Sequence, residues 1–288
     1  MALMPVTVAP ITAADTAAVG RFLTAELNHR VAPATWAAAV DTPWAGDRPN
    51  AGFMLLDDDR VVGAHLAFYS ERTVDGARER FCNLGAWCVH PDYRLHGLRL
   101  LKALLAQDGY HFTDLSPSGS VVPINEKLHF TFLDTETALA PNLPWPSVPG
   151  RTKIITAPEQ IEATLTGADL ALYRDHVNAA AARHLVLQRG DRTCYVIFRK
   201  DRRKNLPLFA SLLHVSDGEI LRQSARPLAR HLLLRHGALA TLSERRVAGR
   251  RPSMSYTLKT PRRKMFRSDS LGPHQIDYLY SELVCLPW

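Results

Sequence analysis

Apolar residues in the first half of the chain recur at two spacings, one typical of strands and one of helices. Strands are predicted over residues 6–11, 52–56, 60–69, 83–89, 111–115 and 130–133. Helices are predicted over residues 14–27, 33–40, 96–106 and 121–128. The two strands that flank the acidic turn Asp57-Asp58-Asp59 should form a hairpin. This mixture predicts an α/β fold.

The second half has a similar pattern. Strands are predicted over residues 184–188, 194–199, 208–215 and 238–242, and helices over residues 158–165, 169–181 and 219–235. The order of hairpin, strand, long helix and strand therefore occurs twice. This repetition predicts a mixed central sheet in each half, with two related halves in tandem.

A proline-rich stretch separates the two halves. Four prolines and one glycine fall within residues 141–150, where they interrupt helices and remove donors for sheet pairing. The expected division is a first domain at 1–140, a linker at 141–152 and a second domain at 153–288. Residues 1–150 hold 11 basic and 16 acidic residues, whereas residues 151–288 hold 24 and 12. The basic half indicates an anionic partner or attraction between the halves.

Composition narrows the class of protein. Of the 288 residues, 46% are hydrophobic and 22% are charged, which is typical of a globular protein. Uninterrupted apolar stretches of about 20 residues are absent, so no membrane span is expected. The N-terminus has no basic residue before its apolar part, and the four cysteines are scattered. These features predict a cytoplasmic location, with neither a disulfide framework nor a bound metal.

The segment 83–105 carries the clearest chemistry. A predicted strand leads through a turn containing Gly97 into a leucine-rich helix. The start of a helix presents backbone N–H groups and the positive end of the helix dipole, which together bind phosphate. Gly97 keeps space clear for a ligand, and Arg94 and Arg99 add positive charge. The segment therefore predicts a phosphate or pyrophosphate site.

The pattern Val89-x-Pro91-x-Tyr93-Arg94-x-x-Gly97-x-Arg99 resembles the acetyl-CoA signature of the GCN5-related N-acetyltransferase superfamily. The resemblance covers roughly the first 135 residues and implies transfer of an acetyl or other acyl group from coenzyme A to an amine, without a metal. Its implied cofactor-binding residues are Trp87, Cys88, Val89, Arg94, Leu95, His96, Gly97, Leu98, Arg99 and Leu100. The Val89 N–H would polarise the thioester carbonyl, which makes Val89 the implied catalytic residue.

The sequence departs from the family pattern at three positions. Arg99 replaces a small residue, His129 replaces a glycine, and Asn125 replaces the tyrosine that often protonates the leaving thiolate. An asparagine cannot serve as a general acid. The acid and base therefore stay open. His90, Tyr93 and Cys88 are better interpreted as structural residues, and Glu26, Glu71 and Glu79 are weighed as bases.

The predicted second half lacks the phosphate-binding pattern. Ser216-Asp217-Gly218-Glu219 follows the equivalent strand and is acidic, so this half is expected to be a degenerate copy or a helper domain. The basic run at residues 199–204 is interpreted as a solvated hairpin tip, because it lies between two predicted strands. No aromatic residues for base stacking accompany it. Nucleic acid is therefore disfavoured as a partner.

Three functions remain in view. The first is N-acyl transfer from acyl-CoA to a small-molecule or peptide amine. The second keeps the fold but uses an acyl carrier protein or aminoacyl-tRNA as donor, with the basic half meeting an acidic carrier protein or RNA. The third is a non-catalytic module that binds CoA, which the departures at Asn125 and Arg99 favour.

Overall fold

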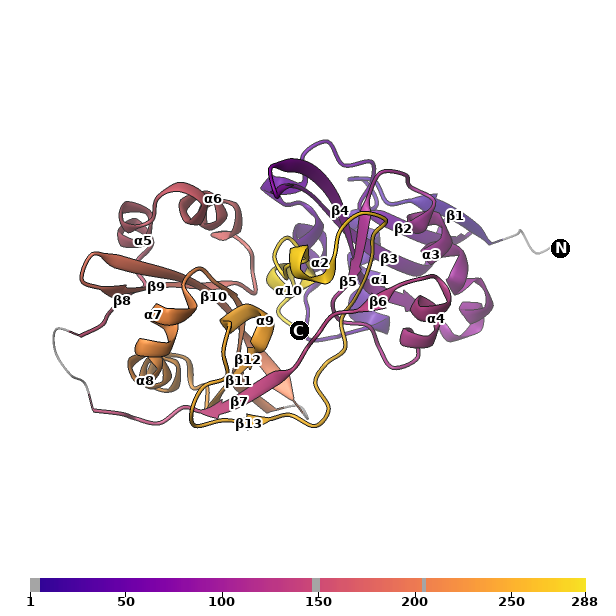
Figure 1. Ribbon diagram of the computed structural model, residues 1–288. Helices are drawn as coiled ribbons and strands as arrows, with labels where there is room; N and C mark the ends of the chain where they lie inside the picture. The colour runs from indigo at the N-terminus through magenta and orange to yellow at the C-terminus, as the bar shows by residue number, and fades with distance from the viewer. Residues whose placement is uncertain (1–5, 147–150, 204–205) are drawn as a thin grey trace.

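Two seven-stranded sheets lie side by side in the computed structural model, which describes residues 6–146, 151–203 and 206–288 (Figure 1). The first sheet has the order β1 (Thr7–Pro10), β2 (Gly52–Asp57), β3 (Arg60–Val74), β4 (Ala77–Val89), β5 (His111–Asp114), β14 (Met265–Arg267) and β6 (Thr131–Phe132). The second has the order β8 (Lys153–Ile155), β9 (Arg183–Arg189), β10 (Arg192–Arg203), β11 (Leu206–Val215), β12 (Ala240–Glu244), β7 (Thr137–Pro141) and β13 (Tyr256–Thr257).

Helices cover both faces of the first sheet. They are α1 (Thr16–Glu26), α2 (Pro33–Val40), α3 (Gly97–Leu105) and α4 (Val122–Lys127). Alternate residues of β3 belong to opposite cores: Leu66 and Phe68 pack with α1 and α2, whereas Ala67 and Tyr69 pack with α3. This two-residue period is expected of a strand that is buried on both faces.

The two sheets follow one plan. In each, four antiparallel strands are followed by a strand that pairs in parallel, and then by two antiparallel strands. The strands β4 and β5 form the parallel pair of the first sheet, and β11 and β12 form that of the second. The predicted mixed sheets and the predicted duplication of the fold are confirmed.

The sheets exchange one strand each. β14, which comes late in the chain, lies between β5 and β6 in the first sheet. β7, which comes before the proline-rich stretch, pairs with β12 in the second sheet. The domain ranges 1–140 and 153–288 stay a prediction, and part of the expected linker, at 147–150, lies outside the described residues. The exchange means that each sheet is completed by a strand from the other side of that linker.

The helix expected at residues 219–235 is two helices. The helices of this half are α5 (Pro158–Thr164), α6 (Gly167–His176), α7 (Gly218–Gln223), α8 (Ala225–His236) and α9 (Arg245–Ala248). α7 ends at Gln223, and α8 begins at Ala225 after Ser224, which has φ −104° and ψ 12°. Pro227 explains the break, because its ring would clash with the carbonyl group of Gln223 in a continuous helix. The predicted end at Gly237 is confirmed, with Gly237 in the left-handed conformation at φ 63°.

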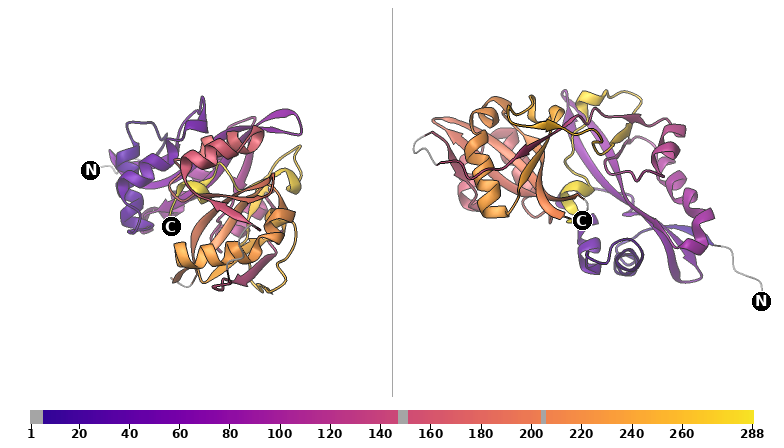
Figure 2. Two further views of the ribbon diagram at one scale, coloured as in Figure 1. Left: turned by 90° about the vertical axis from the view of Figure 1, so that its left-hand side faces the viewer. Right: turned by 90° about the horizontal axis from the view of Figure 1, so that it is seen from below.

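The last described segment of the chain lies where the two halves meet, as its yellow ribbon shows in Figure 1 and in the right-hand view of Figure 2. Its short helix α10 (Glu282–Cys285) contacts α2 and β4 of the first half. A single hydrophobic core joins it to both halves, and includes Trp36, Tyr195 and Val284. The two halves are therefore packed on each other through buried apolar surface rather than tethered loosely.

Arg199 attaches this segment to the second half. It lies on β10, is only 2% exposed, and donates hydrogen bonds to the carbonyl oxygens of Leu283 at 2.9 Å, Leu286 at 3.2 Å and Trp288 at 2.9 Å. The expectation of a solvated tip at residues 199–204 is therefore wrong for Arg199. Its side chain points into the interface because β10 continues past it as a buried strand.

Among the described helices, none is both long and apolar enough to cross a membrane.

Replacing Arg199 with methionine should lower the free energy of unfolding by about 3 kcal/mol, because three buried carbonyl groups would lose their donor. Denaturant titration measures this change. Arg192→Met is the control on the same strand, where an exposed ion pair with Asp217 is lost and about 1 kcal/mol or less is expected. Equal effects of the two changes would contradict the anchoring role of Arg199.

Candidate functional site

The strands β4 and β5 separate after a short parallel contact. Their pairing covers only Phe81 to Asn83 against His111 to Thr113. At the last pair, the Asn83 side-chain amide donates to the carbonyl oxygen of Thr113 at 3.3 Å and to its hydroxyl oxygen at 3.0 Å. Beyond this point the two strands diverge, so the edge of β4 that faces β5 is available to a ligand.

Glu282 of α10 lies between the diverging strands. Its backbone N–H donates to the side-chain oxygen of Asn83 at 3.0 Å, and its carboxylate accepts a hydrogen bond from the Ser116 hydroxyl at 2.7 Å. Gly85 makes room for it, since a Cβ atom at Gly85 would lie 3.0 Å from the Cβ of Glu282. Glu282 thus occupies the start of the gap and holds β4 apart from the segment after β5.

An irregularity in β4 shapes the next part of the gap. The register between β3 and β4 shifts where Ala64 and Leu66 face Cys88 and Gly85. Ala86, at this shift, has φ 53°, a value that is uncommon for a residue with a side chain and typical of bulges and functional sites. The neighbouring Trp87 stacks on His65 with ring centroids 5.0 Å apart.

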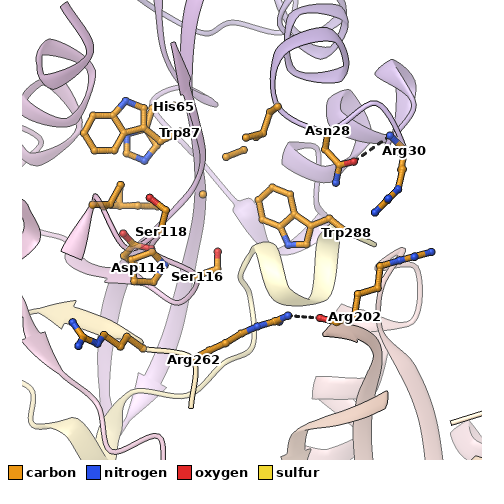
Figure 3. Close-up of a pocket in the computed structure, with 17 residues that line it drawn as sticks. Asn28, Arg30, His65, Trp87, Asp114, Ser116, Ser118, Arg202, Arg262 and Trp288 are labelled. Carbon is orange, nitrogen blue, oxygen red and sulfur yellow. Dashed lines mark hydrogen bonds between the residues drawn. The ribbon is translucent and has the colours of Figure 1, made fainter. Parts of the chain in front are cut away.

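A cavity of about 520 Å³ fills the gap and extends to the second half (Figure 3). Its lining comes from the α1–α2 link, β3, β4, the segment after β5, the end of β10, the segment before β14, and the last residue of the chain. The lining residues are Leu27, Asn28, Arg30, His65, Leu84, Gly85, Ala86, Trp87, Asp114, Ser116, Pro117, Ser118, Val121, Arg202, Arg262, Arg263 and Trp288. Its volume is in the range of small-molecule sites.

The predicted phosphate-binding segment lies beside the far end of β4. A 3₁₀ turn, η2 (Pro91–His96), leads into α3, whose buried face carries Leu100, Leu101 and Leu104. Gly97 has an ordinary helical conformation, so space rather than backbone freedom favours glycine here. A Cβ atom at Gly97 would lie 3.3 Å from Val89 and 3.9 Å from Trp87. The segment and the cavity therefore meet at Trp87.

The other implied cofactor-binding residues differ in their exposure and contacts. Arg94 is exposed, and Leu95 is 96% exposed. Arg99 is turned toward the start of the chain, where its guanidinium donates to the carbonyl oxygen of Val6 at 2.7 Å. Of the implied set, only Trp87 lines the cavity directly. The assignment of the set to coenzyme A stays a prediction.

None of the candidate acids and bases from the sequence is among the described residues that line the cavity. The Tyr93 hydroxyl donates to Asp57, and the His90 ring accepts from the N–H of Asp92 at 3.4 Å. Burial raises the pKa of the Cys88 thiol to about 11, which keeps it protonated. Glu26 is exposed.

The two remaining candidates are paired elsewhere. Glu71 forms an ion pair with Arg78, and Glu79 contacts the His111 ring at 2.9 Å. Both residues are on the β3–β4 hairpin, away from the diverging ends of β4 and β5. Neither carboxylate is therefore available to a group in the cavity.

Asp114 and Glu282 are the acidic residues that sequence reasoning missed. Asp114 ends β5, lines the cavity and is 7% exposed. Burial raises its pKa to about 6, against the hydrogen bond that it accepts from the Asn125 amide at 2.8 Å. Burial raises the pKa of Glu282 to about 7, and the charge of Asp114 adds to this effect.

Only one of these two carboxyl groups had a signal in the sequence. Asp114 follows a predicted strand at the carboxyl end of a parallel pair, where ligands bind in open α/β sheets. Glu282 had none, because its position depends on a segment about 170 residues further along the chain.

Asn125 is fully buried behind Asp114 and does not face the cavity. Its amide is held by the carboxylate, so its place in the structure is that of a support for Asp114. His65, which lines the cavity, is neutral, because burial lowers its pKa to about 3. Within the described residues, no group of three His, Cys, Asp or Glu side chains is placed to hold a metal ion.

The corresponding region of the second half is closed. Asp217 caps α7 by accepting from the N–H groups of Glu219 and Ile220, both at 2.9 Å, and so its carboxylate takes the place that a phosphate would need. The helix α9 packs against both β11 and β12, and Ala248 is buried with Val215. The gap between the parallel strands is thus filled by protein.

Comparison with known proteins gives matches at the level of structure. No protein-family model matches the sequence, and no curated protein matches it either. A GCN5-related N-acetyltransferase from Anabaena variabilis is 11% identical, with 91% of this chain and 72% of that chain covered and a TM-score of 0.60. One from Kribbella flavida is 16% identical, with 91% and 71% covered and a TM-score of 0.55.

Saccharomyces cerevisiae N-myristoyltransferase with bound myristoyl-CoA matches over an even larger share of this chain. It is 9% identical, with 96% of this chain and 84% of that chain covered and a TM-score of 0.51. The chain therefore has the fold of the GCN5-related N-acetyltransferases, and that fold is present twice. The predicted fold is confirmed.

The raised pKa of Glu282 makes a prediction about stability. A carboxyl group whose pKa rises on folding stabilises the fold below its ordinary pKa of 4.5, and this contribution is lost as the pH rises through about 7. Relative to Glu282→Gln, the wild type should therefore lose up to about 3 kcal/mol between pH 4.5 and 7.5. Urea titrations at several pH values measure this. Glu126→Gln, at an exposed position, should keep the pH dependence of the wild type; a similar curve for Glu282→Gln would contradict the prediction.

Proposed function

We propose that this protein is an N-acyltransferase that moves an acetyl or other acyl group from coenzyme A to an amine. The observation that carries the proposal is the cavity between the diverging strands β4 and β5, which meets the start of α3 at Trp87. One end adjoins the start of α3, and the other is lined by the buried carboxyl group of Asp114. The fold shared with acyltransferases supports the same activity.

The coenzyme would bind along β4. Its pantetheine arm carries amide groups, which can pair with the backbone of Trp87 and Val89 on the edge that β5 leaves open. Its pyrophosphate would accept hydrogen bonds from the N–H groups of residues 94–100, at the positive end of α3. The thioester carbonyl would accept from the Val89 N–H, which stabilises the negative charge of the tetrahedral intermediate.

Asp114 is the residue that we assign to proton transfer. The nitrogen of a neutral amine attacks the thioester carbon, the bond from carbon to sulfur breaks, and an amide forms. The proton lost by the nitrogen goes to the Asp114 carboxylate, which then returns it to the thiolate of coenzyme A. A pKa of about 6 suits this exchange, because the carboxylate is present at neutral pH and its acid form is not too weak.

A substitution at Gly97 tests the coenzyme site. Gly97→Glu should abolish detectable binding of acetyl-CoA, because a carboxylate would occupy the space in front of Val89 and repel the pyrophosphate. Calorimetry measures the affinity. Gly97→Ala is the matched control and should bind within about threefold of wild type, since its Cβ needs only a small shift of Val89. An unchanged affinity of Gly97→Glu would show that coenzyme A binds elsewhere.

A substitution at Asp114 tests the proton transfer. Asp114→Asn should lower kcat by about a hundredfold or more, while the Kd for acetyl-CoA stays near that of wild type. Release of free coenzyme A against a panel of amines measures kcat. In the wild type, kcat/KM should fall tenfold for each pH unit below about 6, as Asp114 becomes protonated. This fall adds to any loss caused by protonation of the amine itself.

Two outcomes would contradict this assignment. Full activity of Asp114→Asn would show that another group accepts the proton. Tight binding of acetyl-CoA without turnover in the wild type would favour the alternative of a non-catalytic module, to which the replacement of tyrosine by Asn125 also points.

A further inference from the structure

We infer that the acceptor amine carries an anionic group, either carboxylate or phosphate, which binds to arginines on the side of the cavity formed with the second half. This inference rests on the proposed acyltransferase function and specifies its substrate class. The residues are Arg30, Arg202, Arg262 and Arg263. They form an arginine rim, and we use this name for these four residues.

The arginine rim is assembled from three separate segments. Arg30 lies in the link between α1 and α2, Arg202 lies at the end of β10, and Arg262 and Arg263 precede β14. Figure 3 shows Arg30 and Arg202 across the cavity from His65 and Trp87. The coenzyme site at α3 meets the cavity at Trp87, so the rim lies at the end where an acceptor would enter.

Contacts within the protein hold part of the rim in place. The Arg262 guanidinium donates to the Asp201 carboxylate at 2.9 Å and to the carbonyl oxygen of Arg202 at 2.6 Å. Asp201 is itself buried and accepts from the Ser211 hydroxyl at 2.7 Å. The Arg263 guanidinium lies 5.6 Å from the centre of the Phe132 ring. Guanidinium groups that are already oriented lose less conformational entropy when they bind an anion.

The charges around the cavity are not balanced. Among the described lining residues, Asp114 is the one acidic side chain, and its carboxylate accepts a hydrogen bond from the Asn125 amide. The rim also adjoins Arg199 and Arg203: burial is the main cause that lowers the pKa of each, the charge of Arg262 lowers both further, and the charge of Asp201 opposes this. Clustered positive charges repel one another, and a bound anion would relieve this repulsion.

This arrangement selects amines by the charge of the group at the end away from the reacting nitrogen. A polyamine would meet repulsion at the rim, whereas an amine with a carboxylate or a phosphate could place the anion among the guanidinium groups. The amine would then extend toward Asp114 and the thioester. A compact acceptor is favoured, because the cavity of about 520 Å³ also has to hold the acyl end of the coenzyme.

Matched pairs of amines test the inference. O-phosphoethanolamine is compared with ethanolamine, and β-alanine with β-alaninamide, by calorimetric titration of the protein alone and of the protein saturated with coenzyme A. At least one anionic member should bind about tenfold or more tightly than its neutral partner, and the two pairs separate phosphate from carboxylate. Equal binding within both pairs, or tighter binding of spermidine than of any anionic amine, would overturn the inference.

A double variant locates the effect. Arg30→Gln combined with Arg263→Gln should reduce the preference for the anionic member about tenfold, with the Kd for coenzyme A within about twofold of wild type. Both side chains are exposed, so folding should be retained. Arg21→Gln combined with Arg250→Gln removes the same charge at exposed positions outside the cavity and should keep the preference. An equal loss in both double variants would assign the preference to net charge and overturn the site.

Failure of the proposed function would be seen separately. If the proposed function is wrong, the wild type will not bind coenzyme A. The preference for an anionic amine does not depend on that result, because it is also measured with the protein alone.

Discussion

The wedge that Glu282 forms between β4 and β5 is the constraint on which the candidate site depends. Two parallel strands of a sheet would ordinarily continue to pair, and continued pairing would close the cavity. Here Asn83 makes the last connection to Thr113 and also accepts from the N–H of Glu282, whose carboxylate contacts Ser116. A buried carboxyl group costs free energy. At this position it separates the strands that would otherwise remove the binding space.

The wedge requires the far end of the chain to reach the first half. The strand exchange provides one route, since β14 enters the first sheet shortly before α10. Arg199 provides another connection by binding three carbonyl groups of the last segment. The two copies of the fold are therefore interdependent. The cavity uses residues of both, and neither sheet is complete without a strand from beyond the expected linker.

The two copies of the fold differ at the gap beside their parallel strands. In the first copy the gap beside the parallel strands is open, and the start of α3 carries no acidic cap. In the second copy α9 fills the gap and Asp217 caps the helix. Three arginines of the rim, Arg202, Arg262 and Arg263, come from the basic part of the chain after the expected linker, and Arg30 comes from the acidic first half.

The sequence alone determined the longer elements of the fold, because local patterns carry them: the period of apolar residues, the hairpin turn at Asp57, and the glycine that ends α8. The same kind of local pattern located the segment from Val89 to Arg99, since a strand, a turn and a helix start are adjacent in the chain. The break at Ser224 was also local, and Pro227 could have revealed it. What only the tertiary structure decided depends on long-range contacts. The exchanged strands, the place of Glu282, the use of Asn125 as a support for Asp114, and the assembly of the arginine rim all join residues that lie far apart in the chain or contribute to no local pattern. Burial, which sets the protonation of Asp114 and Glu282, exists only after the chain has folded.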